Sequence, residues 1–211
     1  MKIFKMVFSP IEVNTYILVD ESGDAAIIDC GCYDNEESEG LAAIIKDNKI
    51  NPVLLLNTHC HLDHVFGNRF VMEKYGLRSF SSELEEQNRR EASQHAMLFG
   101  LKMDDPPEPA GFISDSHIVS FGTTELVALH VPGHTSGSLA FYSEKNSCVF
   151  TGDALFAGSI GRTDLAGGDF ETLIESIKCK LFVLPPLTVV YPGHGNETTI
   201  ERERKTNPFF S

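Results

Sequence analysis

Four short segments of the chain concentrate side chains that bind divalent metal ions. The densest, residues 58–64, reads THCHLDH, and the others read PGHT at 132–135, TGD at 151–153 and PGHG at 192–195. Imidazole and carboxylate are the ligands that borderline divalent metals prefer, and a catalytic site keeps coordination positions open for water and substrate. Each segment follows an apolar, strand-like run and lies beside turn residues, so the set predicts a metallohydrolase rather than scattered surface histidines. The candidate ligands are His59, His61, Asp63, His64, His134, Asp153 and His194.

Spacing within the first segment predicts two ligand pairs. Alternate residues of an extended chain share a face, so His59 and His61 can bind one ion together. Asp63 and His64 follow where the chain is expected to turn into a helix through Phe66, and they point to a neighbouring ion.

The remaining candidates complete two sets of three. We expect His134 to complete the first set and His194 the second, with Asp153 bridging both ions. A carboxylate suits a bridge because its two oxygens can hold two dications about 3.5–4 Å apart. A water between such ions would lose a proton near neutral pH, and Asp63 is expected to orient the hydroxide in addition to binding metal.

Length and composition favour one globular domain over residues 1–211. The hydrophobic fraction is 42%, and 17 basic against 30 acidic residues give a formal charge of −13. Such a charge disfavours nucleic acid as a partner. The one tight basic cluster, residues 202–205, is interleaved with Glu201 and Glu203, and we expect a solvated helix end there.

Targeting signals and cysteine usage favour a cytoplasmic location. The first residues lack the apolar stretch of a signal peptide, and no run is long enough to cross a bilayer. Five cysteines without a CxxC pair fit a reducing compartment. Cys60 lies between two candidate ligands, and we expect its side chain to point away from them.

The pattern of apolar runs predicts two similar halves. Each half contains a meander of strands, then a helix, then a buried strand that ends at a ligand segment. Strands are expected at 6–7, 14–19, 25–29, 53–56, 118–121, 124–131, 139–143, 148–150 and 188–191, and helices at 40–48 and 170–181. Every candidate ligand therefore lies at or just past the carboxyl end of a strand, where open sheets collect functional groups.

Residues 82–109 form an insertion between the halves, helical to about residue 102 and then rich in proline. Two placements remain open for this insertion. It lies over the metal pocket, or it is a surface helix without a part in the chemistry.

The four segments together resemble the five-motif signature of the metallo-β-lactamase superfamily, over nearly the whole chain. The resemblance implies an α/β fold, a four-layered αβ/βα sandwich of two mixed β-sheets flanked by helices. It also implies the ligand roles assigned above. Asp153 stands where the best-known group of metallo-β-lactamases carries cysteine, which disfavours β-lactam hydrolysis.

Residues 155–164 and the tail 197–209 resemble the short glyoxalase II-like hydrolases. The resemblance implies hydrolysis of a hydroxyacylglutathione-like thioester by a metal-bridging hydroxide, with two divalent ions. Zinc is the expected metal, and iron or manganese would fit the same ligands. The chain ends at Ser211 without the helical extension that supplies much of the glutathione site in full-length relatives. Arg162 is then the candidate for binding a substrate carboxylate, unless it pairs with Asp164 or Asp169.

Other reactions remain open on the same fold. Persulfide dioxygenases of this superfamily use one iron held by two histidines and an aspartate, and they share the GRTD of residues 161–164. The PGHG segment resembles the hydrolases more closely. A redox metal protein, a nuclease or a metallohydrolase of another substrate class are further alternatives, and neither a basic channel nor a flavodoxin-like domain is evident in the sequence.

Overall fold

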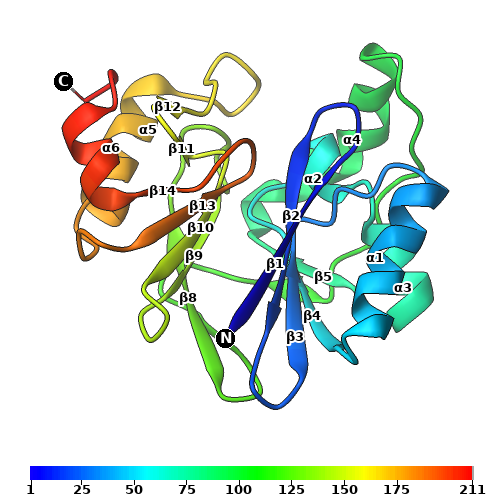
Figure 1. Ribbon diagram of the computed structural model, residues 1–211. Helices are drawn as coiled ribbons and strands as arrows, with labels where there is room; N and C mark the ends of the chain where they lie inside the picture. The colour runs from blue at the N-terminus through cyan, green and yellow to red at the C-terminus, as the bar shows by residue number, and fades with distance from the viewer. Residues whose placement is uncertain (211) are drawn as a thin grey trace.

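The apolar runs of the sequence form the strands of two six-stranded β-sheets that pack face to face (Figure 1). This computed structural model describes residues 1–210. The first sheet has the order β1 (Lys2–Phe8), β2 (Val13–Val19), β3 (Asp24–Ile28), β4 (Asn51–Leu56), β5 (Ser79–Ser81), β6 (Gly111–Phe112). The second has the order β14 (Thr198–Thr199), β13 (Val189–Pro192), β10 (Cys148–Gly152), β9 (Leu139–Ser143), β8 (Thr124–His130), β7 (Ile118–Phe121).

Helices cover the outer faces of both sheets (Figure 1). On the first sheet these are α1 (Asn35–Asp47) and α3 (Asn68–Tyr75), and on the second α5 (Phe170–Ser176) and α6 (Ile200–Thr206). The short α2 (Leu62–Val65) packs on α4 (Glu86–Leu98), which follows a 3-10 turn (Glu83–Glu85), and a small hairpin joins β11 (Leu155–Phe156) to β12 (Ser159–Ile160). The expected αβ/βα sandwich of mixed sheets is confirmed. Within residues 1–210, no helix is long and apolar enough to cross a membrane.

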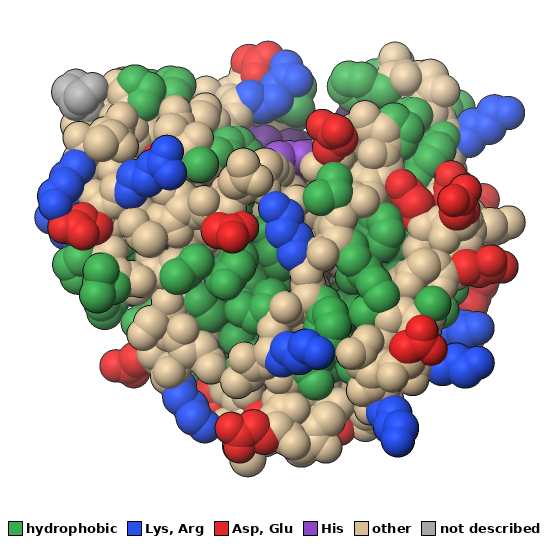
Figure 2. Space-filling model, viewed as in Figure 1, with side chains coloured by type: hydrophobic (Ala, Val, Ile, Leu, Met, Phe, Trp, Pro, Cys, Tyr) green, Lys and Arg blue, Asp and Glu red, His purple; other side chains and the backbone are tan. Residues whose placement is uncertain are grey.

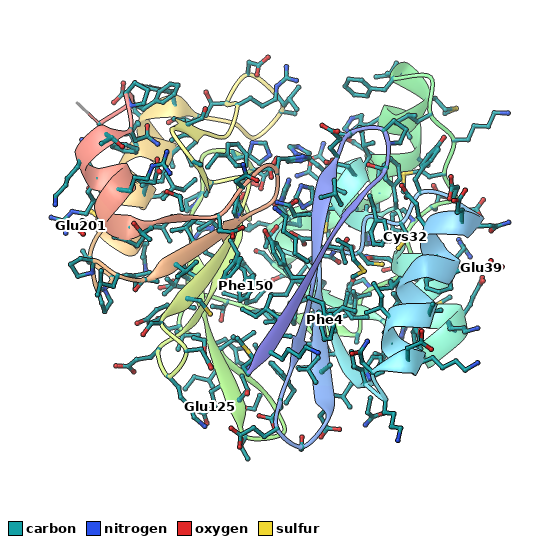
Figure 3. The ribbon with its side chains drawn as sticks, in the orientation of Figure 1. Phe4, Cys32, Glu39, Glu125, Phe150 and Glu201 are labelled. Carbon is teal, nitrogen blue, oxygen red and sulfur yellow. The ribbon has the colours of Figure 1, made fainter. Side chains whose placement is uncertain are left out.

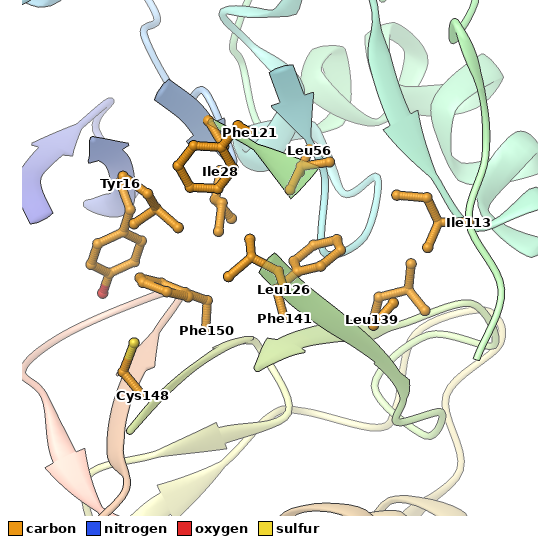
Figure 4. Packing of buried hydrophobic residues seen from close by; sticks show 13 residues of the cluster. Tyr16, Ile28, Leu56, Ile113, Phe121, Leu126, Leu139, Phe141, Cys148 and Phe150 are labelled. Carbon is orange, nitrogen blue, oxygen red and sulfur yellow. The ribbon is translucent and has the colours of Figure 1, made fainter. Parts of the chain in front are cut away.

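The main core lies between the two sheets (Figure 4). Phe150 projects from β10 into this layer toward Tyr16 of β2 (Figures 3 and 4). The Phe150 ring centroid lies 5.2 Å from that of Tyr16, and the ring stacks on Tyr191 at 5.1 Å. Each large apolar side chain buried here contributes on the order of 1.5–3 kcal/mol relative to exposure. The Tyr16 hydroxyl donates a hydrogen bond of 2.7 Å to the carbonyl of Pro192. The core therefore fixes the first residue of the PGHG segment across the sheet interface.

The two halves share one connectivity. An antiparallel run β1-β2-β3 is followed by α1 and a return to β4, which is parallel to β3. In the second half, β8-β9-β10 is followed by α5 and a return to β13, which is parallel to β10. Since β8, β10 and β13 run in the same direction, their carboxyl ends meet at one edge of the second sheet. The similar halves expected from the sequence are present.

Three helices differ from the expected limits, among them α4 of the insertion, which ends at Leu98 rather than near residue 102. Helix α1 begins at Asn35, five residues before the predicted start, because the Asp34 carboxylate caps it by accepting from the backbone of Glu37. The acidic run therefore lies in the first turn, where negative charge is favoured. The predicted helix 170–181 is α-helical only to Ser176 and continues as a π-helix to Leu181.

Glu203 joins α6 to the rest of the second half and generates a stability prediction. This fully buried carboxylate accepts hydrogen bonds from the Gly158 amide, the Thr198 hydroxyl and the Asn207 side chain. Glu203→Gln replaces one acceptor oxygen of this buried group with an NH₂ group and replaces the carboxylate with a weaker neutral acceptor, so the free energy of unfolding should fall by about 1–3 kcal/mol. Urea denaturation measures the loss. Glu201→Gln, an exposed change in the same helix, is the control, and equal stability of both variants would contradict the prediction.

Candidate metal centre

The candidate ligands lie where strands of both sheets end. His59 and His61 follow β4 of the first sheet, whereas His134, Asp153 and His194 follow β8, β10 and β13 of the second. Figure 2 shows histidine side chains at the floor of a hollow between the two halves of the molecule. The loops of both sheets thus meet in one place.

Three imidazoles form a first set. The Nε2 atoms of His59 and His134 lie 3.2 Å apart, and Nδ1 of His61 lies 2.9 Å from His134 Nε2. The three ligand atoms are all within 4.8 Å of one another. These are the pair His59 and His61 that the spacing predicted and the His134 that was expected to complete it.

Asp63, His64 and His194 form a second set. Asp63 Oδ2 lies 3.1 Å from His194 Nε2 and 3.6 Å from His64 Nε2. These atoms also lie within 4.8 Å of one another. Asp63 and His64 are presented by the four-residue helix α2, which ends at Val65 before α3 begins.

Asp153 lies between the two sets. Its Oδ2 is 3.7 Å from His134 Nε2 of the first set and 3.6 Å from His194 Nε2 of the second, and its Oδ1 is 3.3 Å from His64 Nε2. A carboxylate in this place can offer an oxygen to each of two neighbouring cations.

Four of the five histidines are held by their outer ring nitrogen, which leaves Nε2 facing the centre. Such outer contacts set the tautomer and orientation of a metal-binding imidazole. The acceptors of the Nδ1 atoms are Thr58 Oγ1 for His59, Asp29 Oδ2 for His64, the Arg162 carbonyl for His134 and the Glu12 carbonyl for His194. His61 differs, because its Nδ1 faces the centre.

Asp29, which is not among the ligands predicted from the sequence, supports two residues of the first ligand segment. It is 2% exposed, and it accepts hydrogen bonds from the Thr58 amide, the Thr58 hydroxyl and His64 Nδ1. Its φ of 53° is unusual for a residue with a side chain. The internal repeat was the available signal, since Asp29 follows β3 as Asp153 follows β10.

The donor atoms fit a cation. His64 Nε2 and Asp153 Oδ1 are buried, and neither makes a hydrogen bond within the described part of the chain. Unsatisfied buried polar atoms are costly, and a bound ion would satisfy both. Burial alone would lower the pKa of His64, but the carboxylates of Asp63, Asp153 and Asp29 raise it well above the usual value. The surrounding carboxylates therefore favour positive charge at this point.

The first set is suited to ligation in a different way. Burial, followed by the neighbouring imidazoles, holds the pKa of His59 well below its usual value. Burial and His134 lower the pKa of His61 to about 3. Both rings are therefore neutral near pH 7, the state in which imidazole binds metal.

The structure also shows the surroundings of Arg162 and Cys60, for which the sequence led to expectations. The Arg162 guanidinium forms a bidentate pair with Asp164, at 2.8 and 2.7 Å, which is one of the internal pairings expected as the alternative to substrate binding, and it is half exposed. The Cys60 side chain packs with Leu62, Val65 and Ala92, as expected of a thiol directed away from the ligands. Burial, with a smaller contribution from Glu85, raises the pKa of this thiol.

Gly193 allows the PGHG segment to approach the bridging carboxylate. A Cβ atom here would lie 2.1 Å from Asp153 Oδ1 and 2.8 Å from the His64 ring. Gly193→Ala should therefore displace Asp153 and weaken metal binding about tenfold or more, measured by competition with a chromophoric chelator. Gly40→Ala is the control, because a Cβ there meets no atom within 4 Å. Unchanged affinity in Gly193→Ala would show that the close approach has no role at the centre.

Comparison with known proteins identifies the family. A sequence profile described as the metallo-beta-lactamase superfamily matches residues 9–194. Hydroxyacylglutathione hydrolase GloC of Haemophilus influenzae is 37% identical over 200 residues, covering 94% of this chain and 92% of that protein.

Two solved structures are similar over the full chain. BLEG-1, a B3 metallo-beta-lactamase, has a TM-score of 0.92 at 31% identity, with complete coverage of both chains. TTHA1623 in a di-iron-bound form has a TM-score of 0.89 at 36% identity, covering 98% of this chain and 99% of the other. With the profile match, the shared fold and the clustered histidines and aspartates, the chain belongs to the metallo-beta-lactamase superfamily.

Proposed function

We propose that the protein is a dinuclear metallohydrolase that cleaves a small thioester of the hydroxyacylglutathione type. The observation that carries the proposal is the convergence of seven imidazole and carboxylate side chains into two sets with Asp153 between them. The similarity to GloC supports the substrate class, and the family supports hydrolysis. Zinc is the proposed metal, although TTHA1623 holds two irons on a similar fold.

The chemistry of the site favours a leaving group that needs little protonation. Two bound cations would lower the pKa of water and polarise a carbonyl oxygen. Asp63 and Asp153 carry their carboxylates into the centre, where they can orient the attacking water and accept a hydrogen bond from it. A departing thiolate, whose thiol has a pKa of about 8.5, requires no strong acid, whereas an amine would. A thioester therefore matches this set of side chains better than an amide.

The central test measures hydrolysis of S-lactoylglutathione and metal content on the same preparations. Protein loaded with Zn²⁺ should cleave the thioester, and removal of metal by a chelator should abolish the activity. His59→Ala and Asp153→Asn should each lower activity at least a hundredfold and reduce the metal content measured by elemental analysis. Full activity of the metal-free protein would reject the proposal.

Assays of the same protein with other substrates distinguish thioester hydrolysis from two other reactions. Oxygen consumption with glutathione persulfide on an iron-loaded sample would indicate the dioxygenase. The similarity to BLEG-1 makes β-lactam hydrolysis a second candidate, so a chromogenic cephalosporin belongs in the substrate panel. Turnover of either compound above that of every thioester would replace the proposed substrate class.

Arg162 is the proposed contact for a substrate carboxylate. Its carbonyl is fixed by the hydrogen bond from His134, while its guanidinium lies on the surface in a pair with Asp164. A carboxylate of the thiol carrier can replace Asp164 in the same bidentate geometry. Arg162→Met should raise KM for S-lactoylglutathione about tenfold and leave kcat within about twofold, because the interaction is equally strong in substrate and transition state.

Asp164→Asn is the control for Arg162→Met, because it alters the partner of the arginine and keeps the guanidinium. It releases the guanidinium from its internal partner, so KM should stay the same or fall. Steady-state kinetics on both variants check the pair of expectations. An unchanged KM in Arg162→Met would assign the arginine to shaping the loop alone.

A further inference from the structure

The insertion between the two halves places a buried carboxylate beside the metal centre. Glu85 ends the 3-10 turn that leads into α4, and its side chain is fully buried. Neither a helix over the pocket nor a surface helix without a part in the chemistry implies this contact. Glu85 is absent from the candidate ligand sets, yet its carboxylate reaches the backbone of two ligand loops.

The carboxylate of Glu85 accepts four hydrogen bonds, two at each oxygen. Oε2 accepts from the Cys60 amide at 2.8 Å and from the Asn88 side chain at 2.9 Å. Oε1 accepts from the Thr135 hydroxyl at 2.6 Å and from the Gly137 amide at 2.9 Å. Every donor is supplied by a different residue, and three of them belong to the ligand loops.

These contacts join the two loops that form the first ligand set. Cys60 stands between His59 and His61, on the loop that follows β4 of the first sheet. Thr135 directly follows His134, on the loop that follows β8 of the second sheet. One carboxylate thus holds together the backbones that carry all three imidazoles, although they come from opposite sheets.

The place of Glu85 is fixed by a close approach to Gly137 and by an anchor in the following turn of α4. A Cβ atom on Gly137 would lie 2.6 Å from Glu85 Oε1, so only glycine permits this contact. One turn later in α4, the Arg89 side chain donates to the Pro106 carbonyl and pairs with Glu108, both at 2.9 Å. The insertion is therefore anchored at both ends, and Glu85 has a fixed place from which to act.

We propose that Glu85 is a positioning residue that sets the distance between His134 and the pair His59 and His61. The inference rests on the proposed metal centre but not on the identity of the substrate. A carboxylate is required because both oxygens must accept. Glutamine has nearly the same shape, yet its NH₂ group would face a backbone N–H on either side, that of Cys60 or that of Gly137, and this hydrogen bond to the loop would be lost.

The test compares Glu85→Gln with Glu83→Gln, an exposed change in the same turn. Binding of Zn²⁺ is measured by competition with a chromophoric chelator, and the visible spectrum of Co²⁺-loaded protein reports the ligand geometry. Glu85→Gln should raise the dissociation constant of one of the two ions about tenfold or more and leave that of the other within about threefold. It should also alter the absorption bands of bound Co²⁺. Glu83→Gln should match the unmodified protein in both measurements.

A role in stability alone gives a different result. Glu85→Gln would then unfold at lower denaturant concentration while both dissociation constants and the Co²⁺ spectrum stayed unchanged, and this outcome overturns the proposal. Should Glu85→Gln fail to fold, Thr135→Val removes one of the same hydrogen bonds. Thr135→Val should raise the dissociation constant of the same ion by a smaller factor. Unchanged dissociation constants in Thr135→Val also overturn the proposal.

The measurement is independent of turnover. A protein that binds two ions and shows the Glu85 effect but cleaves no thioester would reject the substrate class and retain the positioning role. If the protein cleaves thioesters, and Glu85→Gln and Thr135→Val bind metal as the unmodified protein does, only the positioning role is rejected.

Discussion

The structure depends on an electrostatic constraint: carboxylates and imidazoles are buried together with their donor atoms facing one point. Asp29, Asp63 and Asp153 surround His64 in a place from which water is largely removed. Buried charges of one sign are unfavourable without a partner, and a pair of cations is the partner that this geometry fits. The backbone features around the centre, including the left-handed Asp29 and the side-chain-free Gly193, serve to hold this arrangement.

The sandwich places the centre by bringing together strand ends that are distant in sequence. The parallel pairs β3-β4 and β10-β13 deliver their following loops to the same edge, and the aromatic layer around Phe150 fixes the two sheets relative to each other. The bond from Tyr16 to the Pro192 carbonyl couples this core directly to a ligand segment. A single hydrogen bond therefore connects the aromatic core to a loop that carries a candidate ligand.

Much of this arrangement was predictable from sequence because the ligands are local in the chain and have distinctive side chains. The pairing of His59 with His61 follows from strand periodicity, and the fold class followed from the family resemblance. Asp29 and Glu85 are not among the predicted residues: only the repeat of the two halves marks Asp29, which follows β3 as Asp153 follows β10, and an acidic residue in a helical turn such as Glu85 has no distinctive pattern. Their importance depends on which backbone amides lie opposite, and only the folded chain shows this. Helix limits at Asn35 and Ser176 depended on a cap and on a π-helical continuation.

Each set of donors takes members from both halves of the molecule. His59 and His61 belong to the amino-terminal half and His134 to the other, while Asp63 and His64 are matched by His194. Neither half alone contains three members of a set. A bound ion would consequently act as a cross-link between the layers, so occupancy and cohesion of the sandwich become thermodynamically coupled. In such a molecule the cofactor belongs to the architecture as much as to the reaction.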